Sequence, residues 1–219
     1  MKFIDEQQQL RILNKFIGPT PIASARPVLY TMAGIPASGK TTFLSLQEKQ
    51  GTLPQDYYYH DPDRVMEELL EYQNDFNNFG AENARSYWEL PARKLADELL
   101  FPKAVEHRMN IVMDMGLCRS EILDMVRVCR AQGYSVRMQI IYCDLSVAIR
   151  RSKKRSRYVP EQEISKRALF LATNIASIRS MADNMQIWDN SDIAKPYLPI
   201  TPEQAEVSLQ QNYGLCSTG

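Results

Sequence analysis

One stretch of the chain reads Gly34-Ile35-Pro36-Ala37-Ser38-Gly39-Lys40-Thr41, which matches the pattern G-x-x-x-x-G-K-[ST] of a phosphate-binding loop, or P-loop. It follows an apolar run, residues 28–33, that has the composition of a buried strand. In such a loop, glycines let backbone N–H groups surround phosphate, the lysine reaches the outer phosphates, and the threonine hydroxyl ligates Mg²⁺. A helix expected from Thr41 to about Gln50 would point its positive end at the same anion.

The stretch therefore predicts binding of a nucleoside triphosphate. The residues that we expect to contact it are Gly34, Ala37, Ser38, Gly39, Lys40, Thr41 and Thr42, with Thr41 also on Mg²⁺. The chain has no N-K-x-D motif of the kind that reads guanine in G proteins. ATP is therefore the expected phosphate donor.

Composition limits the other classes of function. The chain has 219 residues, and 44% are hydrophobic, which is enough for one large α/β domain with a buried core. Lys and Arg number 26, as do Asp and Glu, so the whole chain has no bulk attraction for nucleic acid or an anionic membrane. We therefore expect nucleic acid to be an improbable partner.

The cysteines and the first residues bear on the cellular compartment. The four cysteines form no C-x-x-C pair and there are two histidines, which indicates reduced thiols without a zinc site or a disulfide framework. Residues 1–9 lack the apolar core of a secretory signal, and no stretch has the length of a membrane span. We expect a cytoplasmic protein with no membrane partner, and delivery to a host cell as an effector stays open.

Strands and helices alternate along the chain. Apolar or β-prone runs at residues 28–33, 57–60, 110–114, 136–143 and 186–188 predict an α/β fold of the P-loop NTPase or kinase type, with a parallel sheet of about five strands and helices on both faces. Ligands bind outside the carboxyl ends of such strands. We divide the chain into an N-terminal helix and linker (1–27), a P-loop kinase domain (28–192) with a lid around 150–160, and a C-terminal tail with a short helix (193–219).

The region after the second strand should be largely helical. We expect a helix from about Asp63 towards Tyr72, a polar stretch over residues 74–80, and a long helical region over 82–108. Pro91 and Pro102 should break or kink that region, because proline lacks the backbone N–H that a helix needs.

Asp61 and Asp63 end the strand that follows the P-loop helix. A carboxylate there can take the proton from an acceptor hydroxyl that faces the γ-phosphate, and Asp63 is the better candidate for this role. Asp61 is a candidate contact to the acceptor. The alternative for both is a structural role as a cap of the next helix, which aspartate fills well.

Residues 150–157 carry six cations and no acid. Charge on a transferred phosphoryl group needs cations brought by a closing lid, and arginine forks suit phosphate oxygens best, so Arg150 and Arg157 are the candidates. A solvated face and a nucleic-acid patch are the alternatives.

Asp114 ends the strand that begins at residue 110. It is placed to hold Mg²⁺ or its water, or to bind hydroxyls of the acceptor, while Arg119 could reach an acceptor phosphate and Gly116 frees the loop between them. A role in capping the next helix is the alternative.

These features together resemble the zeta toxin family of P-loop kinases. The residues that carry the resemblance are Ala33 to Thr42, His60 to Asp63, Asn110 to Asp114 with Gly116 and Arg119, Gly133-Tyr134, Arg150, Arg157 and Trp188 to Ser191. The resemblance implies an ATP- and Mg²⁺-dependent kinase with Asp63 as general base, Lys40 and Thr41 on phosphate and metal, and Arg150 and Arg157 as phosphate clamps. It also adds Asn190 to the expected nucleotide contacts and an antitoxin-like protein to the expected partners.

Known members of the family phosphorylate UDP-N-acetylglucosamine, and related effector enzymes phosphorylate NAD. The resemblance thus implies transfer of the γ-phosphate to a hydroxyl of a small acceptor, either a nucleotide sugar or a dinucleotide. The chain has Asp114-Met115-Gly116 where members often show Glu-Gly-Thr, so the reaction type is indicated more closely than the acceptor. The alternatives are a metabolic or antibiotic-modifying kinase, a nucleotide-binding regulatory protein without an acceptor, and a nucleic-acid end kinase.

Overall fold

The computed structural model of the chain describes residues 2–155 and 158–213. The chain divides into two compact units: the first unit comprises Met1–Pro27 and Gln55–Met113, and the second unit comprises Val28–Pro54 and Asp114–Gly219. Each unit is described by itself. The domain boundaries at residues 27 and 192 stay predictions.

The first unit is mostly helical. Its elements are α1 (Glu6–Phe16), β2 (Tyr57–His60), α3 (Pro62–Glu67), α4 (Leu70–Phe79), α5 (Ala81–Leu95), the π-helix η1 (Ala96–Leu100), α6 (Phe101–Glu106) and the larger part of β3 (Asn110–Gly116). β2 pairs in parallel with β3. The side chain of Gln8 in α1 donates a 2.6 Å hydrogen bond to Glu71 Oε2 in α4, so the N-terminal helix is docked within this unit.

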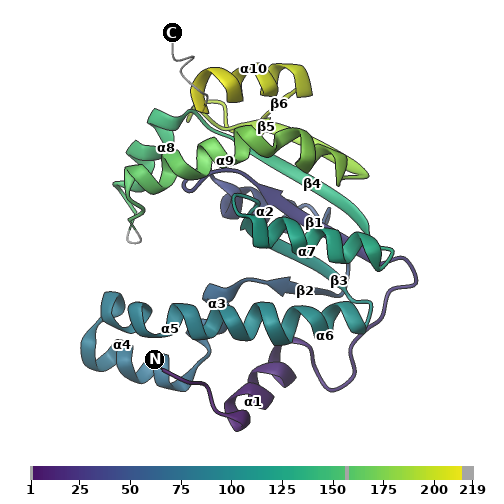
Figure 1. Ribbon diagram of the computed structural model, residues 1–219, viewed down its shortest axis with the longest axis vertical. Coiled ribbons are helices and arrows are strands. Elements are labelled where there is room, and N and C mark those ends of the chain that lie inside the picture. The colour runs from purple at the N-terminus through teal and green to yellow at the C-terminus, as the bar shows by residue number, and fades with distance from the viewer. Residues whose placement is uncertain (1, 156–157, 214–219) are drawn as a thin grey trace. The chain divides into compact units, whose positions relative to one another are not determined.

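The helical part of the first unit differs from the sequence-based prediction in two places. α4 includes residues 74–79, which we had placed between two predicted helices as a polar stretch. They are helical because Tyr72 and Asp75 on one face of α4 are buried, and Asp75 accepts a 2.7 Å hydrogen bond from Trp88 Nε1. α5 continues through Pro91, since the buried Trp88 and Ala92 keep it packed on both sides of the proline. The departure from α-helical geometry falls instead at η1, between α5 and α6 and just before Pro102; α5 and α6 are labelled in Figure 1.

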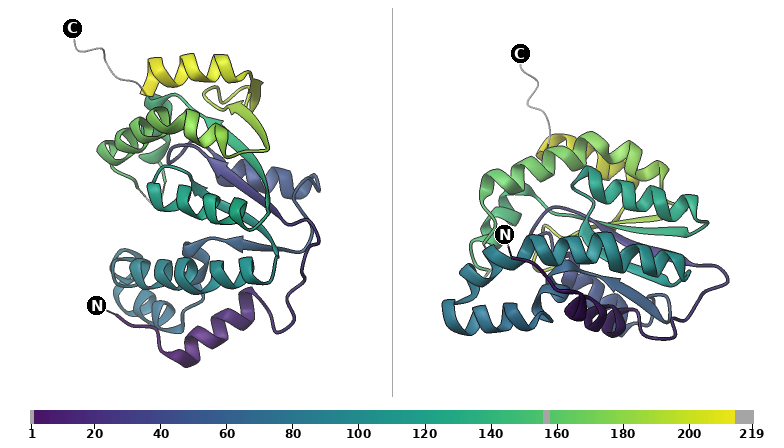
Figure 2. Two further views of the ribbon diagram at one scale, coloured as in Figure 1. Left: turned by 45° about the vertical axis from the view of Figure 1, so that its right-hand side comes forward. Right: turned by 60° about the horizontal axis from the view of Figure 1, so that its bottom comes forward.

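The second unit contains most of the sheet. Its elements are β1 (Val28–Ala33), α2 (Lys40–Lys49), the end of β3, α7 (Ser120–Ala131), β4 (Ser135–Tyr142), α8 (Leu145–Ser152), α9 (Glu161–Ser180), β5 (Asn184–Asp189), β6 (Leu198–Ile200) and α10 (Pro202–Tyr213). β4 lies between β1 and β5 and pairs in parallel with both. In the left view of Figure 2, α7 and α9 lie on one side of β1 and β4, and α2 lies on the other.

The strand order is β2-β3-β1-β4-β5-β6, and the boundary between the units falls within β3. The prediction of a parallel P-loop fold with helices on both faces is confirmed. A sixth strand, β6, pairs antiparallel with β5 in the Pro-rich tail. It is an edge strand, where Pro199 is tolerated because one side of the backbone needs no partner.

Apolar stripes fasten the helices of the second unit to its sheet. On α7 the buried residues of the stripe include Ile122, Val126 and Cys129, and on α9 they are Ile164, Ala168, Leu171 and Ile178. The C-terminal helix α10 also belongs to this packing, since Tyr213 OH accepts a hydrogen bond from the backbone N–H of Cys143. None of the described helices combines the length and hydropathy needed to cross a membrane.

Candidate active site

The P-loop joins β1 to α2 through two glycines in left-handed or strained backbone. Gly34 has a φ of 143°, and a Cβ there would lie 2.5 Å from the carbonyl oxygen of Ile141. Gly39, with a φ of 101°, is the N-cap residue of α2, and its missing Cβ leaves room for the side chains of Asn190 and Tyr197. No other residue fits either position without moving the backbone or its neighbours.

Lys40 lies across this loop. Its Nζ donates hydrogen bonds to the carbonyl oxygens of Gly34 at 3.0 Å and Ile35 at 2.9 Å. Burial lowers the pKa of the Lys40 ammonium, and the nearby charge of Asp114 partly opposes that effect. Within the described residues, both hydrogen bonds of this ammonium go to carbonyl groups of the loop, and an incoming phosphate can replace them.

Thr41 and Asp114 bring two oxygens together beside Lys40. Thr41 Oγ1 donates a 2.7 Å hydrogen bond to Asp114 Oδ2, and Asp114 Oδ1 is buried and accepts no hydrogen bond from the described residues. A hydroxyl beside a carboxylate with spare acceptor capacity suits Mg²⁺, which binds few protein oxygens and keeps waters and substrate phosphates as its other ligands. The described residues hold no cluster of three or more His, Cys, Asp or Glu that could bind a metal.

A pocket of about 290 Å³ opens over the loop. The residues that line it are Ala37, Gly39, Lys40, Thr41, Thr42, Arg151, Arg155, Asn190 and Tyr197. Asn190 is 5% exposed, and its Nδ2 donates a 2.7 Å hydrogen bond to the carbonyl oxygen of Ser38. Ser38 Oγ is buried and, within the described part of the chain, has no hydrogen-bond partner. The predicted loop residues and Asn190 therefore lie together.

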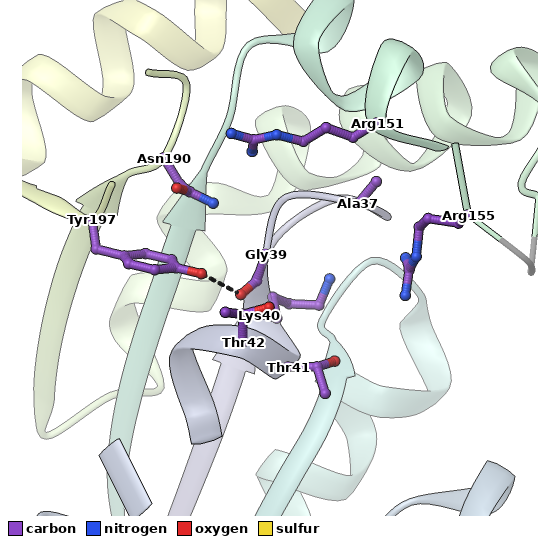
Figure 3. A pocket seen from close by; sticks show the side chains of 9 residues that line it. All are labelled: Ala37, Gly39, Lys40, Thr41, Thr42, Arg151, Arg155, Asn190 and Tyr197. Atoms are coloured by element: carbon purple, nitrogen blue, oxygen red, sulfur yellow. Dashed lines mark hydrogen bonds between the residues drawn. The ribbon is translucent and has the colours of Figure 1, made fainter. Parts of the chain in front are cut away.

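Tyr197 was missed by the sequence analysis. Its hydroxyl donates a 3.0 Å hydrogen bond to the carbonyl oxygen of Gly39, and its ring lies 5.1 Å from that of Phe43 in α2 (Figure 3). We had placed this residue in the C-terminal tail, outside the kinase domain. No motif or spacing in the Pro-rich tail points to it, because the contact depends on the turn that precedes β6.

The lid arginines differ in position from those that we named. Arg151 and Arg155 line the pocket, whereas Arg150 is exposed and is not among the lining residues. Arg157 lies outside the described residues. Arg151 also contacts Cys143 Sγ through Nη1 at 3.4 Å, which holds it on the pocket side of α8.

The loop after β3 is tied to the P-loop. The backbone N–H of Gly34 donates a 3.0 Å hydrogen bond to the carbonyl oxygen of Gly116, and Cys118 Sγ lies 3.4 Å from the carbonyl oxygen of Gly34. Arg119 occupies the N-cap position of α7 and does not line the pocket. Asp114 and Gly116 are thus set against the loop, and Arg119 stays a predicted acceptor contact.

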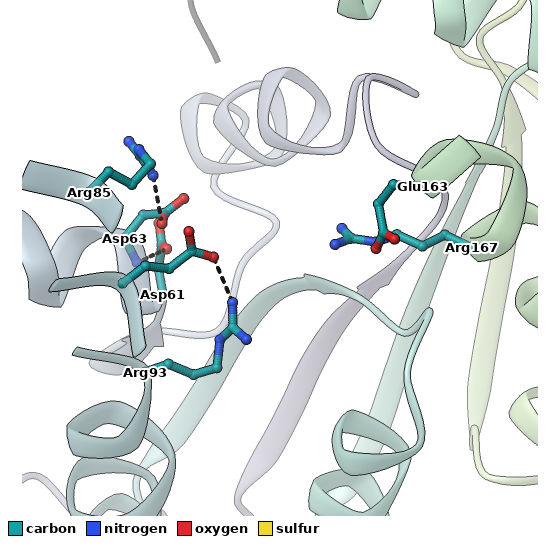
Figure 4. Close-up of polar contacts among 7 residues, drawn as sticks. Asp61, Asp63, Arg85, Arg93, Glu163 and Arg167 are labelled. Carbon is teal, nitrogen blue, oxygen red and sulfur yellow. Dashed lines mark hydrogen bonds and ion pairs between the residues drawn. The ribbon is translucent and has the colours of Figure 1, made fainter. Parts of the chain in front are cut away.

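Asp61 and Asp63 belong to the first unit, at the end of β2. Asp61 Oδ1 accepts a 2.9 Å hydrogen bond from the backbone N–H of Asp63, so Asp61 caps α3, the structural alternative that the sequence left open. Asp63 Oδ1 lies 3.2 Å from Nη1 of Arg85 in α5, and 36% of the Asp63 side chain is exposed (Figure 4). The sequence analysis missed Arg85, because its partner is 22 residues away.

A buried histidine anchors the end of β2. His60 is fully buried, its Nδ1 lies 3.1 Å from Tyr58 OH, and its Nε2 lies 3.1 Å from Asp97 Oδ1 in η1. The π-helix therefore places a carboxylate against the residue next to Asp61.

Comparison with known proteins gives three findings. The family model described as Zeta toxin matches residues 17–199. A structure from work on the PezAT chromosomal toxin–antitoxin system of Streptococcus pneumoniae aligns with a TM-score of 0.70 and 15% identity, over 100% of this chain and 92% of that chain. The AvrRxo1-ORF1:-ORF2 complex with ATP aligns with a TM-score of 0.64 and 16% identity, over 97% of this chain and 72% of that chain. No curated protein sequence matches.

Proposed function

The chain belongs to the zeta toxin family and is an ATP-dependent kinase, and we propose that it transfers the γ-phosphate of ATP to a hydroxyl of a small acceptor that contains a nucleotide. The observation that carries the proposal is the arrangement in the second unit of Lys40, Thr41 and Asp114 around one loop. In it a cation, a hydroxyl and a carboxylate share the space where phosphates bind in P-loop proteins.

In the proposed mechanism, the backbone N–H groups of residues 37–41 surround the β-phosphate, and Lys40 leaves the carbonyl oxygens of Gly34 and Ile35 to contact the outer phosphates. Thr41 and Asp114 would hold Mg²⁺, Asp114 directly or through water, and the ion would supply positive charge against the phosphates of ATP. Asp114 Oδ1, which is buried and has no hydrogen-bond partner among the described residues, supports this role.

Asp63 is the proposed general base, and it accepts the proton of the acceptor hydroxyl. Arg85 supports this role, because its Nη1 lies 3.2 Å from Asp63 Oδ1 and restricts the orientation of the carboxylate. Asp61, whose side chain caps α3, positions Asp63 through the backbone N–H of that residue and stays a proposed acceptor contact.

Arg151 and Arg155 are the arginines that we propose to stabilise charge on the transferred group. Both line the pocket over the P-loop, and Arg151 belongs to the last turn of α8. Arg150 and Arg157 stay candidates for the same role from the resemblance to the family.

For the acceptor we propose a nucleotide sugar or a dinucleotide, such as UDP-N-acetylglucosamine or NAD. We further propose an antitoxin-like protein partner, which the similarity to the structure from the PezAT toxin–antitoxin system supports. The buried free thiols of Cys118, Cys129 and Cys143 support a cytoplasmic site of action, where thiols stay reduced.

The test is incubation of the protein and Mg·ATP with a panel of nucleotide sugars, NAD, nucleosides and aminoglycosides, with products identified by mass spectrometry. We expect a phosphorylated nucleotide sugar or dinucleotide that disappears with Lys40→Ala. Transfer only to an aminoglycoside or nucleoside would contradict the proposed acceptor. Release of inorganic phosphate alone, with every panel member unchanged, would contradict transfer to a small molecule.

A further inference from the structure

A second pocket in the second unit, of about 560 Å³, lies on the face of the sheet that α2 covers. Strand register places Tyr30, Arg137 and Asn184 side by side across β1, β4 and β5, and Gln139 beside Gln186 one step further along. These residues lie in the amino-terminal halves of their strands or at their middle, whereas the P-loop follows the carboxyl end of β1. The pocket is therefore separate from the nucleotide site.

The position of α2 explains why this part of the sheet face is open. Phe43 near the start of the helix packs against Trp188, with ring centroids 5.2 Å apart. Beyond it, Gln47 and Gln50 at the end of the helix form the far wall of the pocket, and the sheet beneath carries polar side chains instead of the apolar ones that helices cover. Neither Asp nor Glu lines this pocket.

A chain, or relay, of hydrogen bonds from Trp188 determines which way the side-chain amides of Gln139 and Gln186 point. Trp188 Nε1 donates a 2.7 Å hydrogen bond to Gln139 Oε1, and Gln139 Nε2 donates a 3.1 Å hydrogen bond to Gln186 Oε1. Because an indole nitrogen can only donate, the orientation of both amides follows from Trp188. The amino group of Gln186 is left at the end of the relay as a donor, and it bonds to no acceptor in the described part of the chain.

The opposite wall and the floor add further donors. Gln47 Nε2 donates a 3.2 Å hydrogen bond to Gln50 Oε1, which leaves the amino group of Gln50 as a donor on the helix side. Tyr30 is 3% exposed, and its hydroxyl has no hydrogen-bond partner among the described residues. Burial raises the pKa of Tyr30 far above its usual value, so the hydroxyl stays protonated and can donate.

Arg137 supplies the charge. It lies between Tyr30 and Asn184 in the strand register, its side chain is exposed, and it forms no ion pair with the described acids. A pocket with one cation, several N–H and O–H donors and no carboxylate is complementary to an anion whose oxygens accept hydrogen bonds.

We propose that this pocket binds a small oxyanion, a carboxylated or phosphorylated metabolite, with its charged group on Arg137 and its oxygens on the Gln186 amino group and the Tyr30 hydroxyl. The site goes beyond the proposed kinase reaction, because its residues are not among those that hold the nucleotide. Carboxylates and phosphate esters share the chemistry that the pocket recognises, and the experiment separates them.

The experiment titrates the full chain, with its P-loop saturated by Mg·ADP, with citrate, inorganic phosphate and glucose 6-phosphate in turn. Isothermal titration calorimetry gives affinity and stoichiometry, and the indole N–H signal of Trp188 in NMR spectra reports occupancy, since that group begins the relay. We expect one equivalent of citrate or of a phosphate ligand to bind and to shift this signal. If citrate binds more tightly than the phosphate ligands, the natural ligand is a carboxylate; if a phosphate ligand binds more tightly, it is a phosphorylated metabolite.

Two variants and a control locate the site. Arg137→Gln is expected to weaken binding about tenfold or more, and Gln186→Glu to abolish it by placing a carboxylate in the pocket. Arg127→Gln, on the exposed surface of α7, removes the same charge elsewhere and should leave the affinity unchanged. Kinase activity with Mg·ATP should persist in all three. The proposal is overturned if none of the three probes binds beside Mg·ADP, or if Arg137→Gln and Arg127→Gln weaken binding equally.

Discussion

The hydroxyl of Thr41 and the carboxylate of Asp114 are joined by a 2.7 Å hydrogen bond, although 73 residues separate them in the chain. The contact links the first turn of α2 to the carboxyl end of β3, and both residues belong to the second unit. It connects the motif that predicts nucleotide binding with the acid that the proposed function assigns to Mg²⁺.

Asp114→Asn should raise the Mg²⁺ concentration needed for half-maximal activity by about 10–100-fold, because the amide keeps the shape of the side chain but loses the charge that holds the ion or its water. A titration of activity with Mg²⁺ at fixed ATP measures the change. Asp124→Asn, an exposed acid paired with Arg127 on α7, is the matched control. Equal Mg²⁺ dependence of the two variants would remove Asp114 from the metal site.

Tyr197→Phe should weaken ATP binding about two- to tenfold, which corresponds to the loss of one hydrogen bond of about 0.5–1.5 kcal/mol. The hydroxyl supports the Gly39 carbonyl, so its removal loosens the turn at the start of α2, while the ring stays packed on Phe43. Equilibrium titration with a fluorescent ATP analogue reads the affinity. Tyr158→Phe, which changes an exposed tyrosine, is the comparison, and a loss of the same size there would contradict the assignment.

Arg151→Gln and Arg155→Gln should each lower kcat about tenfold or more with a smaller change in the KM for ATP, because cations that act on the transferred group matter most in the transition state. Arg150→Gln, an exposed neighbour, should have a weaker effect. Steady-state kinetics on the three variants ranks them. A larger loss for Arg150→Gln would favour the assignment made from the family resemblance over the one made from the pocket.

ATP affinity should fall with rising pH below the range in which an ordinary lysine titrates, about 10.4. Burial lowers the pKa of Lys40, so the free protein loses the ammonium charge at a lower pH than usual, and the neutral amine binds phosphate poorly. For the same reason, burying the charged ammonium lowers the free energy of unfolding at neutral pH. This loss of stability diminishes as the pH rises through the lowered pKa, because the folded protein then releases the proton before the unfolded chain does. Affinities measured from pH 7 to 10 check this, and Lys40→Ala should show a flat profile.

The P-loop, the parallel sheet and the stripes of α7 and α9 could be predicted from the sequence, because local spacing determines them. The same spacing put Asp63 and Asp114 at strand ends. It did not give Arg85, Arg155 or Tyr197, whose positions depend on side chains that meet across turns and between helices. Short sequence motifs do not encode such contacts between distant residues.

The helices of the first unit show a second limit of prediction from sequence. Pro91 and the polar residues 74–79 are unfavourable locally, yet both lie in helices because Trp88 and Asp75 are buried together. Tertiary packing there outweighs the local preference. The π-helix η1 was equally absent from the prediction; in the structure it carries Asp97, whose Oδ1 lies 3.1 Å from His60 Nε2.

The most direct test of phosphoryl transfer with Asp63 as base follows the label of γ-phosphate-labelled ATP in the wild type and in Asp63→Asn, in the presence of the acceptor found by mass spectrometry. The account predicts label on the acceptor with the wild type, and with Asp63→Asn a loss of transfer of about a hundredfold or more while ATP affinity stays unchanged. Equal transfer by the two proteins would contradict the assignment of Asp63, and label that appears only as inorganic phosphate with the wild type would contradict the kinase reaction itself.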